Sequence, residues 1–495
     1  MKKIGFDNDA YISRQSEQIR KRINEFGGKL YLEFGGKLFD DFHASRVLPG
    51  FAPDSKLQML KSISDNVEVV IVINSGDIES NKIRRDLGIT YDADVLRLID
   101  AYRASGLYVG SVVLSQFKGQ LAAQAFKEKL EQLGIKVFIH YTIDGYPYNV
   151  SHIVSDEGFG KNEFIETTRP LVVITAPGPG SGKMATCLSQ LYHENQRGSK
   201  AGYAKFETFP VWNLPLKHPV NLAYEAATAD LNDVNMIDPY HLEAYGVTTV
   251  NYNRDVEVFP VLNAIFEKIE GKSPYKSPTD MGVNMAGYAI CDDEAVKAAS
   301  KEEIIRRYFA ALCDCAMGRG KKEAVDKIVS LMNQAGVSVE DRKVIKPALD
   351  KSEATNGQPA VAIELPDGRI VTGKTSNLLG ASSAALLNAA KAIAGLPDDL
   401  LMIAPSIIEP IQALKTGILK GHNPRLHSDE TLIALSMSAN TNPVAKKALE
   451  AIELLKDCEA HSTVILSQVD SDVYRKIGIN LTCEPRYQTK KLYHK

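Results

Sequence analysis

A lysine that follows three closely spaced glycines is the best candidate for chemistry in this chain. Residues 176–183 read APGPGSGK, so the glycines precede Lys183 at alternate positions. Glycines allow successive backbone N–H groups to turn toward an anion, and a lysine side chain reaches the outer phosphates of a nucleotide. This spacing predicts a phosphate-binding loop with Lys183 as its catalytic residue. The residues that we expect to hold the ligand are Gly178, Gly180, Ser181, Gly182 and Thr186.

The elements on either side of this loop support the same interpretation. Residues 171–175 (LVVIT) predict a buried strand, and a helical pattern begins near Met184. A helix that starts directly after the loop adds partial positive charge to an anion site. Met184 departs from the P-loop pattern, because a Ser or Thr that binds magnesium normally follows the lysine. The metal must then come from other residues, or the phosphate is bound without metal.

The next predicted strand, residues 202–209, carries Lys205 and Glu207. Because strand side chains alternate between faces, these two residues share one face. Either they contact the ligand and its metal, or they pair with each other across solvent. In the first case Lys205 assists catalysis, and Glu207 and Asp238 hold Mg²⁺ that accompanies ATP. The stretch from the loop to this strand resembles the dethiobiotin-synthetase-like branch of P-loop enzymes, in which the second strand also carries a ligand-facing lysine.

Two other glycine-lysine strings compete with Lys183. Residues 368–375 (GRIVTGKT) match the pattern G-x-x-x-x-G-K-[ST] letter for letter. However, Pro366-Asp367-Gly368 is a turn signal and the following residues favour a strand, so we predict a β-hairpin there and not a phosphate loop around Lys374. The string Gly35-Gly36-Lys37 follows a predicted strand at residues 30–34, and we interpret it as a plain turn.

Composition limits the class of protein. The chain has 495 residues, of which 44% are hydrophobic and 24% charged, as in soluble proteins with several domains. A formal net charge of -3 gives no general reason to bind nucleic acid or an anionic membrane. No apolar run approaches a membrane-spanning length, and no secretory signal is evident, so we expect a cytoplasmic protein. Six cysteines are too sparse for a disulfide framework.

The hydrophobic pattern predicts an α/β protein with three parts. Residues 1–290 alternate buried strands with helices, which indicates a doubly wound, mostly parallel sheet that contains the P-loop-like strand, loop and helix. Residues 291–355 have a helical pattern and form an insert. Residues 356–495 form a second α/β subdomain. Its strands are expected at 360–365, 369–372, 400–404 and 463–466.

One polar tract in this last part allows two interpretations. It contains Asn423, Arg425, His427, Asp429 and Glu430. Either these side chains contact a substrate, or the tract is a polar loop followed by a helix that Ser428 caps.

Several strings along the chain resemble the bacterial family catalogued as domain of unknown function 1846. They include LYLEFGGKLFDDFHASRVLPGF, APGPGSGKMATCLSQLYHE, SPTDMGVNMAGYAI and NPRLHSDETLIALSMSANTNP. The resemblance implies a bacterial cytoplasmic protein with a large α/β body, a helical insert and a C-terminal α/β subdomain. It supplies no catalytic residues.

Two functions follow from these observations. The first is an ATP-dependent or phosphosubstrate-dependent kinase or ligase that acts on a small metabolite. The second is a non-catalytic sensor of a nucleotide or phosphometabolite, which needs no metal ligand and agrees better with Met184. A metal-dependent hydrolase ranks last, because the ten histidines form no HxH or HExxH string. In both main cases the partner is a small phosphate-containing ligand, and assembly into a homo-oligomer is left open.

Overall fold

The structure is a computed structural model, and it describes residues 3–36, 38–39, 41–84 and 87–489. Lys37 of the glycine-lysine string at 35–37 therefore lies outside the described residues. The chain divides into two compact units. The N-terminal unit comprises Ile4–Tyr224 and Asp233–Ala299, and the C-terminal unit comprises Met1–Lys3, Glu225–Asn232 and Ser300–Lys495. The division falls inside helix α13 (Asp293–Ala316), so most of the predicted helical insert lies in the C-terminal unit.

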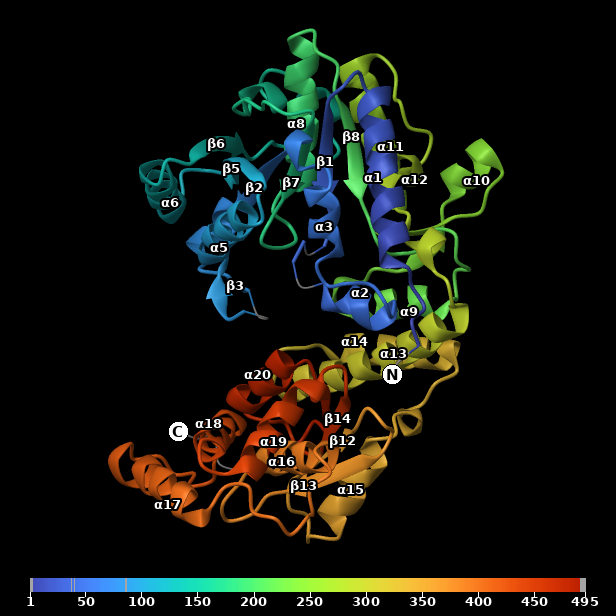
Figure 1. The fold of residues 1–495 in the computed structure, drawn as a ribbon. Helices are drawn as coiled ribbons and strands as arrows, with labels where there is room; N and C mark the ends of the chain where they lie inside the picture. The colour runs from blue at the N-terminus through green and yellow to red at the C-terminus, as the bar shows by residue number, and fades with distance from the viewer. Residues whose placement is uncertain (1–2, 37, 40, 85–86, 490–495) are drawn as a thin grey trace. The chain divides into compact units, whose positions relative to one another are not determined.

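A parallel seven-stranded sheet is the centre of the N-terminal unit (Figure 1). The strand order is β11-β8-β1-β7-β2-β5-β6, and all neighbouring strands run parallel. The strands are β1 (Leu30–Phe34), β2 (Val67–Asn74), β5 (Tyr108–Phe117), β6 (Lys136–Tyr141), β7 (Leu171–Thr175), β8 (Gly202–Phe206) and β11 (Gly282–Val283). The prediction of a mostly parallel α/β sheet is confirmed.

Helices cover both faces of this sheet. On one face, α8 (Lys183–Gln196) and α11 (Asn253–Glu270) bury Leu188 and Phe266 against Tyr31 and Val172 in a single core cluster. The other face carries α1 (Asn8–Glu25), α3 (Ser55–Lys61) and α5 (Tyr91–Ala104). The sheet is therefore buried on both sides, which explains why its central strands read as continuous apolar runs.

Most of the remaining elements of the N-terminal unit are short. The helices are α2 (Phe42–Val47), α4 (Ser75–Glu79), α6 (Leu121–Gln132), α7 (Val150–Ile153), α9 (Pro219–Ala227, which continues into the other unit), α10 (Pro239–Tyr245) and α12 (Pro278–Met281). Two antiparallel strand pairs are β3 (Ile83–Arg84) with β4 (Ile89–Thr90), and β9 (Asn235–Ile237) with β10 (Val250–Tyr252). Single 3₁₀ turns are Ser64–Asn66, Phe159–Lys161 and Ala286–Ala289.

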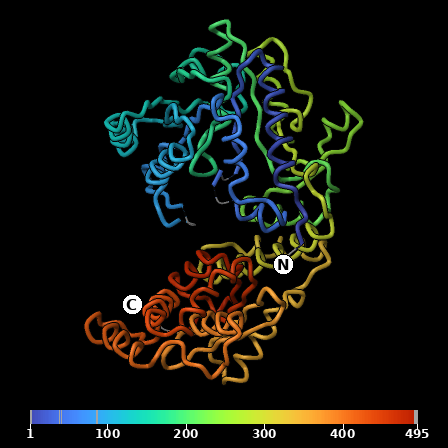
Figure 2. Tube along the Cα trace, in the orientation of Figure 1, coloured from blue at the N-terminus to red at the C-terminus, as the bar shows by residue number. Residues whose placement is uncertain are grey.

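The N-terminal strand β1 lies between β7 and β8, although these strands are far from it in the chain (Figures 1 and 2). Helix α8 connects β7 to β8 and so crosses β1 on one face of the sheet. Consequently the carboxyl ends of β1, β7 and β8 are neighbours, and ligands of open α/β sheets bind at such ends.

A glycine at an irregular position lets β2 and β5 pair closely. The register shifts between Val69 and Val70, so Gly110 is an extra residue opposite β2. A Cβ atom at Gly110 would overlap the carboxylate of Glu68, which accepts hydrogen bonds from the backbone N–H and hydroxyl of Thr168. Only glycine leaves room for this buried carboxylate.

The Gly110→Ala variant is therefore expected to lower the free energy of unfolding by about 1–3 kcal/mol, because the added methyl group overpacks the site. Urea denaturation measures this change. Gly417→Ala serves as the control, since no atom lies within 4 Å of a Cβ there and its φ is not positive. An equal loss in both variants would contradict the explanation.

The C-terminal unit contains a four-stranded mixed sheet of order β13-β12-β14-β15. Its strands are β12 (Ala360–Glu364), β13 (Ile370–Lys374), β14 (Glu459–Ser462) and β15 (Asn480–Cys483). Its helices, besides α13, are α14 (Lys322–Ala335), α15 (Ile345–Glu353), α16 (Ala381–Ile393), α17 (Pro405–Ala413) with a π-helical turn Leu414–Ile418, α18 (Ser428–Ala439), α19 (Pro443–Ala451) and α20 (Gln468–Ile477). Its 3₁₀ turns are Ala229–Leu231, Val339–Asp341 and Ile452–Leu455.

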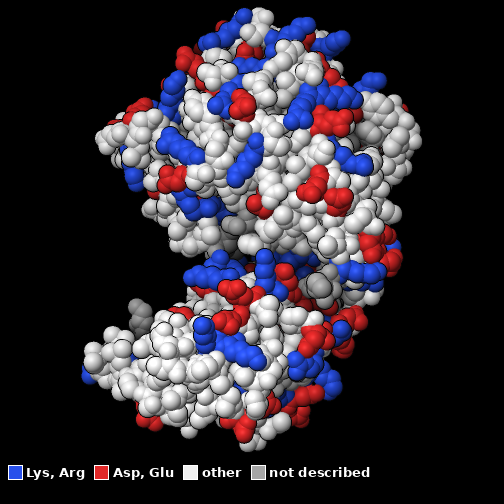
Figure 3. All heavy atoms as spheres, in the orientation of Figure 1, with Lys and Arg blue, Asp and Glu red and all other residues white. Residues whose placement is uncertain are grey.

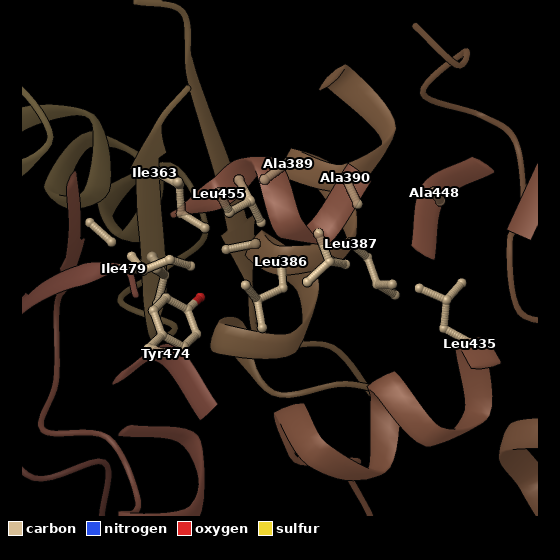
Figure 4. Close-up of a cluster of buried hydrophobic side chains, with 14 of the residues drawn as sticks. Ile363, Leu386, Leu387, Ala389, Ala390, Leu435, Ala448, Leu455, Tyr474 and Ile479 are labelled. Carbon is tan, nitrogen blue, oxygen red and sulfur yellow. The ribbon is translucent and has the colours of Figure 1, made fainter. Parts of the chain in front are cut away.

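Aliphatic residues of α16 form the centre of this unit's core. Leu386 and Leu387 pack with Ile363 of β12, Leu435 of α18 and Tyr474 of α20 (Figure 4).

On the molecular face in Figure 3, lysine and arginine side chains alternate with aspartate and glutamate over both units. The described residues on that face therefore form no extended surface of one sign.

Two predicted strands of the C-terminal unit are wrong. Residues 400–404 bury Met402 and Ile403 in a bend before Pro405 begins α17. Residues 463–466 are also a bend, and the strand β14 comes just before them. In both places apolar residues are buried without strand pairing, whereas β14 has the polar sequence EAHS, which hydrophobicity does not identify.

Candidate functional site

The glycine loop, residues 176–182, follows β7 at the carboxyl edge of the sheet and leads directly into α8. Gly182 is the N-cap of α8 with φ 90°, and Gly180 has φ 73°. Both values lie in the left-handed region that favours glycine. The strand, loop and helix predicted from the sequence are thus present in that order.

Neighbouring strands hold the carbonyl groups of this loop. Asn74, at the end of β2, donates a hydrogen bond of 3.3 Å to the carbonyl oxygen of Gly180. Ser115, near the end of β5, donates one of 2.5 Å to the carbonyl oxygen of Ser181. Gly178 packs directly against the phenol of Tyr91, where a Cβ atom would overlap the ring. These contacts fix the loop from the sheet side.

The amide groups of the loop are left without protein partners. None of the six backbone N–H groups from Gly180 to Ala185 donates a hydrogen bond to another described residue. Lys183 is half-buried and forms no ion pair or hydrogen bond within the described part of the chain. A run of free amides at the start of a helix, together with an unpaired lysine, is the donor set of an anion-binding site.

The side chains at the start of α8 differ in their environment. Ser181 and Thr186 are buried, and their hydroxyl groups make no hydrogen bond to described residues. Met184 is partly buried and packs against the core beneath α8. The position that carries a magnesium-binding hydroxyl in P-loop enzymes is thus apolar and contributes to packing.

Lys205 is fully engaged with neighbouring groups. Its Nζ donates hydrogen bonds to the hydroxyl of Tyr252 and the carboxylate of Asp255, and it lies 3.0 Å from Glu207 Oε1. Although burial lowers it, these two carboxylates together raise the pKa of Lys205 well above its usual value. An ammonium group has three hydrogens, so a phosphate would have to displace one of these partners.

Glu207 belongs to the same buried cluster. Burial raises its pKa to about 7, with Lys205 opposing the rise and Asp255 adding to it. The two carboxylates therefore compete for one lysine, and a proton on Glu207 relieves their repulsion near neutral pH. A metal bound at Glu207 Oε1 would lie beside the ammonium group of Lys205, which repels it.

Asp238, the other predicted metal ligand, caps a helix. It precedes α10, and one carboxylate oxygen accepts a hydrogen bond from the backbone of His241. The other oxygen accepts bonds from the backbone N–H and hydroxyl of Thr279. The structure thus brings Lys183, Lys205 and Glu207 to the same edge of the main sheet, whereas Asp238 follows β9 of the separate strand pair.

Sequence reasoning missed Glu33 of β1. This residue pairs in register with Ile174 of β7 and Lys205 of β8, so it lies between the loop strand and the lysine cluster. It is 9% exposed, and the hydroxyl of Tyr203 donates a 2.7 Å hydrogen bond to its Oε2. The glutamate inside the apolar string LYLEF could have indicated a functional residue, because burying an unpaired charge in a strand costs free energy.

The competing string around Lys374 is a β-hairpin. Residues of β12 and β13 pair antiparallel, and Lys374 lies opposite Ala360 in this pairing. The residues that would have to form a phosphate loop are therefore strand, as predicted.

The polar tract at 423–430 begins helix α18. His427 is the N-cap, one residue earlier than the predicted Ser428. Both the backbone N–H and the hydroxyl of Ser428 donate to the buried carboxylate of Asp470 on α20, 2.8 and 2.7 Å away. A hydrogen bond to Asp470 raises the pKa of His427. Since Asp470 joins the starts of two helices, the capping interpretation is favoured over substrate contact.

Comparison with known proteins places the chain in a family. The model "Domain of unknown function DUF1846, N-terminal" matches residues 4–336, and its C-terminal counterpart matches residues 340–493. The chain belongs to this family. A "UPF0371 protein" of Streptococcus thermophilus (strain ATCC BAA-491 / LMD-9) is 58% identical over 495 residues, covering 100% of both chains. Another of Streptococcus pneumoniae (strain JJA) is 57% identical over the same length.

The family description and the names of these relatives state no activity, so function must be argued from the site. Two global features of this DUF1846 member bear on that argument. Among the described residues, no helix is long and apolar enough to cross a membrane. The same residues contain no group of three or more His, Cys, Asp and Glu side chains placed to hold a metal ion.

Proposed function

We propose that this protein binds the phosphate groups of a nucleotide or phosphorylated metabolite at the glycine loop, and that it acts as a kinase or ligase on a small metabolite. The observation that carries the proposal is the run of free amides from Gly180 to Ala185 beside the unpaired Lys183. Three of these amides precede α8 and the other three belong to its first turn, and free amides before and at a helix start are a recurrent anion-binding arrangement.

The chemistry expected at this site is charge stabilisation. Phosphoryl transfer requires positioning of the phosphates and compensation of their negative charge more than covalent participation of the protein. The loop amides would bind the phosphate oxygens, and Lys183 would stabilise the group that is transferred. The role proposed from the sequence for Lys205 changes here, because its bonds to Asp255 and Glu207 make it a positioning residue for that cluster.

ATP is the proposed cosubstrate, and Mg²⁺ the proposed metal. Mg²⁺ commonly binds through one or two carboxylates together with substrate phosphates and water, so it needs no complete protein cage. One carboxylate at this sheet edge would therefore be enough to hold such an ion together with the phosphates. When bound, Mg²⁺ would offset charge on the β- and γ-phosphates.

A non-catalytic sensor is the second candidate, and the packing of Met184 favours it. With an apolar residue at this position, no hydroxyl follows the lysine to assist a metal. A sensor would bind phosphate equally well with and without Mg²⁺ and would catalyse no reaction.

Calorimetric titration of the full chain tests these functions. We expect ATP and ADP to bind with a stoichiometry of about one per chain, inorganic phosphate to bind more weakly, and Mg²⁺ to strengthen nucleotide binding. Slow ATP hydrolysis, detected by ³¹P NMR, would support the enzymatic function. Nucleotide binding that is independent of Mg²⁺, with no ATP hydrolysis, would favour the sensor. Absence of binding by all three ligands would refute the phosphate site.

A further inference from the structure

We propose that Glu33 is the carboxylate that binds the divalent cation of the phosphate ligand. This inference rests on the phosphate site proposed above, and it assigns the metal to a residue that the sequence did not indicate.

The first argument is the position of Glu33. Since β1 lies between β7 and β8, the last residues of β1 are adjacent to the strand that leads into the glycine loop. Glu33 pairs in register with Ile174, one residue before β7 ends. Its side chain lies on the α8 face, where Tyr203 donates to it. Both Glu33 and the loop are thus on the same edge and the same side of the sheet.

The thiol of Cys187 gives an independent indication of this closeness. Cys187 is one helical turn after Lys183 on α8, and its side chain faces the sheet. Burial raises the pKa of this thiol, Glu33 adds to the rise, and Lys183 opposes it. The carboxylate and the lysine are therefore both close enough to act on one buried group of α8.

The second argument is the unbalanced charge. Glu33 is more than nine-tenths buried and forms no ion pair with a described residue. Oε2 accepts the hydrogen bond from Tyr203, while Oε1 has no hydrogen-bond partner in the described part of the chain. Buried charges in proteins are normally paired or bound to metal. Beside a phosphate the carboxylate would be repelled, unless a cation lies between the two anions.

The third argument is that the other carboxylates have their own partners. Glu207 is held by Lys205 at 3.0 Å and shares that lysine with Asp255. Asp238 accepts bonds from His241 and Thr279. Of these three carboxylates, Glu33 alone has no lysine within ion-pair distance and also keeps one oxygen without a hydrogen bond to a described residue. One carboxylate with phosphate and water ligands is the arrangement that Mg²⁺ prefers.

The test compares ADP binding with Mg²⁺ and with EDTA in the native protein and in Glu33→Gln. The glutamine keeps an oxygen that can accept the hydrogen bond from Tyr203 and removes the charge. In the native protein Mg²⁺ should strengthen ADP binding about tenfold, and in Glu33→Gln this gain should disappear. Affinity in EDTA should be unchanged or higher in the variant, because a repulsive charge is lost.

Glu194→Gln is the matched control. Glu194 is 5% exposed, accepts a 2.7 Å hydrogen bond from Tyr31 and also faces the sheet, but it lies near the other end of α8. This variant should keep the full effect of Mg²⁺. If Glu33→Gln also keeps it, Glu33 is not the metal ligand.

A measurement on the native protein covers the case that Glu33→Gln does not fold. Fe²⁺ in place of Mg²⁺, with ascorbate and hydrogen peroxide, produces radicals that cleave the backbone near the metal. We expect ADP-dependent cleavage close to Glu33 and within residues 176–183, and cleavage elsewhere would overturn the assignment. If native protein binds ADP without any effect of Mg²⁺, this inference is wrong while the phosphate site stands. If it binds no ADP, both are wrong.

Discussion

ADP is expected to bind the Lys183→Ala variant about 10- to 100-fold more weakly than the native protein, because a hydrogen bond between charged groups contributes about 1.5–3 kcal/mol. Lys183 is half-buried and forms no ion pair with a described residue, so its removal leaves no unpaired partner in the fold. The thermal unfolding temperature should therefore stay close to the native value. Calorimetric titration measures the affinity, and circular dichroism checks the fold.

Lys200→Ala is the control for the change in net charge. Lys200 is exposed and follows α8 at the end of the helix opposite the glycine loop. The Lys200→Ala variant should bind ADP with the affinity of the native protein. Equal weakening in both variants would indicate a general electrostatic effect, and unaltered binding by Lys183→Ala would refute the role of the loop lysine.

The sequence allowed the loop and its supporting elements to be predicted because their signals are local. Apolar runs mark β2 and β7, and the glycines before Lys183 mark the loop. The exact pattern match at residues 368–375 forms a hairpin, because turn and strand preferences determine the structure of that stretch. Local structure thus carried more information than the motif alone.

The parts that could not be predicted depend on contacts between distant segments. Glu33 becomes part of the candidate site only because β1 inserts between β7 and β8, and strand order is not readable from hydrophobic patterns. Similarly, Tyr252 and Asp255 of later elements reach the amino group of Lys205. Residue spacing placed Lys205 and Glu207 on one face, but it did not reveal these partners.

The strand β14 was missed for a related reason. It carries Glu459 and His461 inward, and a strand with buried charges is not expected from hydrophobicity. The compensation comes from Arg342, whose guanidinium is almost completely buried. Its Nη1 lies 2.7 Å from Glu459, its Nη2 donates to the carbonyl oxygen of Ala460 at 2.9 Å, and its Nε donates to Thr482 at 3.0 Å. Arg342 thus joins the polar strand β14 to its surroundings, and Arg306 adds a second buried guanidinium to Glu459.

Replacing Arg342 is expected to destabilise the C-terminal unit strongly. Arg342→Ala should lower the free energy of unfolding by about 3–5 kcal/mol, because Glu459 would remain buried with an incomplete set of partners. Arg342→Lys should lose much of the same stability, since an ammonium group cannot reproduce the planar fork that serves both strands. Urea denaturation measures the change, and hydrogen exchange locates it. Protection of the backbone amides of β14 and β15 from hydrogen exchange should fall in these variants.

The control is Arg369→Ala in the same unit. Arg369 forms an exposed ion pair with Asp367, at 2.7 Å and with side chains 60% and 52% exposed. Such surface pairs contribute about 0–1 kcal/mol, so this variant should unfold nearly like the native protein. A similarly small effect for Arg342→Ala would mean that water or neighbouring arginines replace its bonds to Glu459. In that case the polar strand would not depend on the buried guanidinium, and Arg306, which also donates to Glu459, would be the residue to change next.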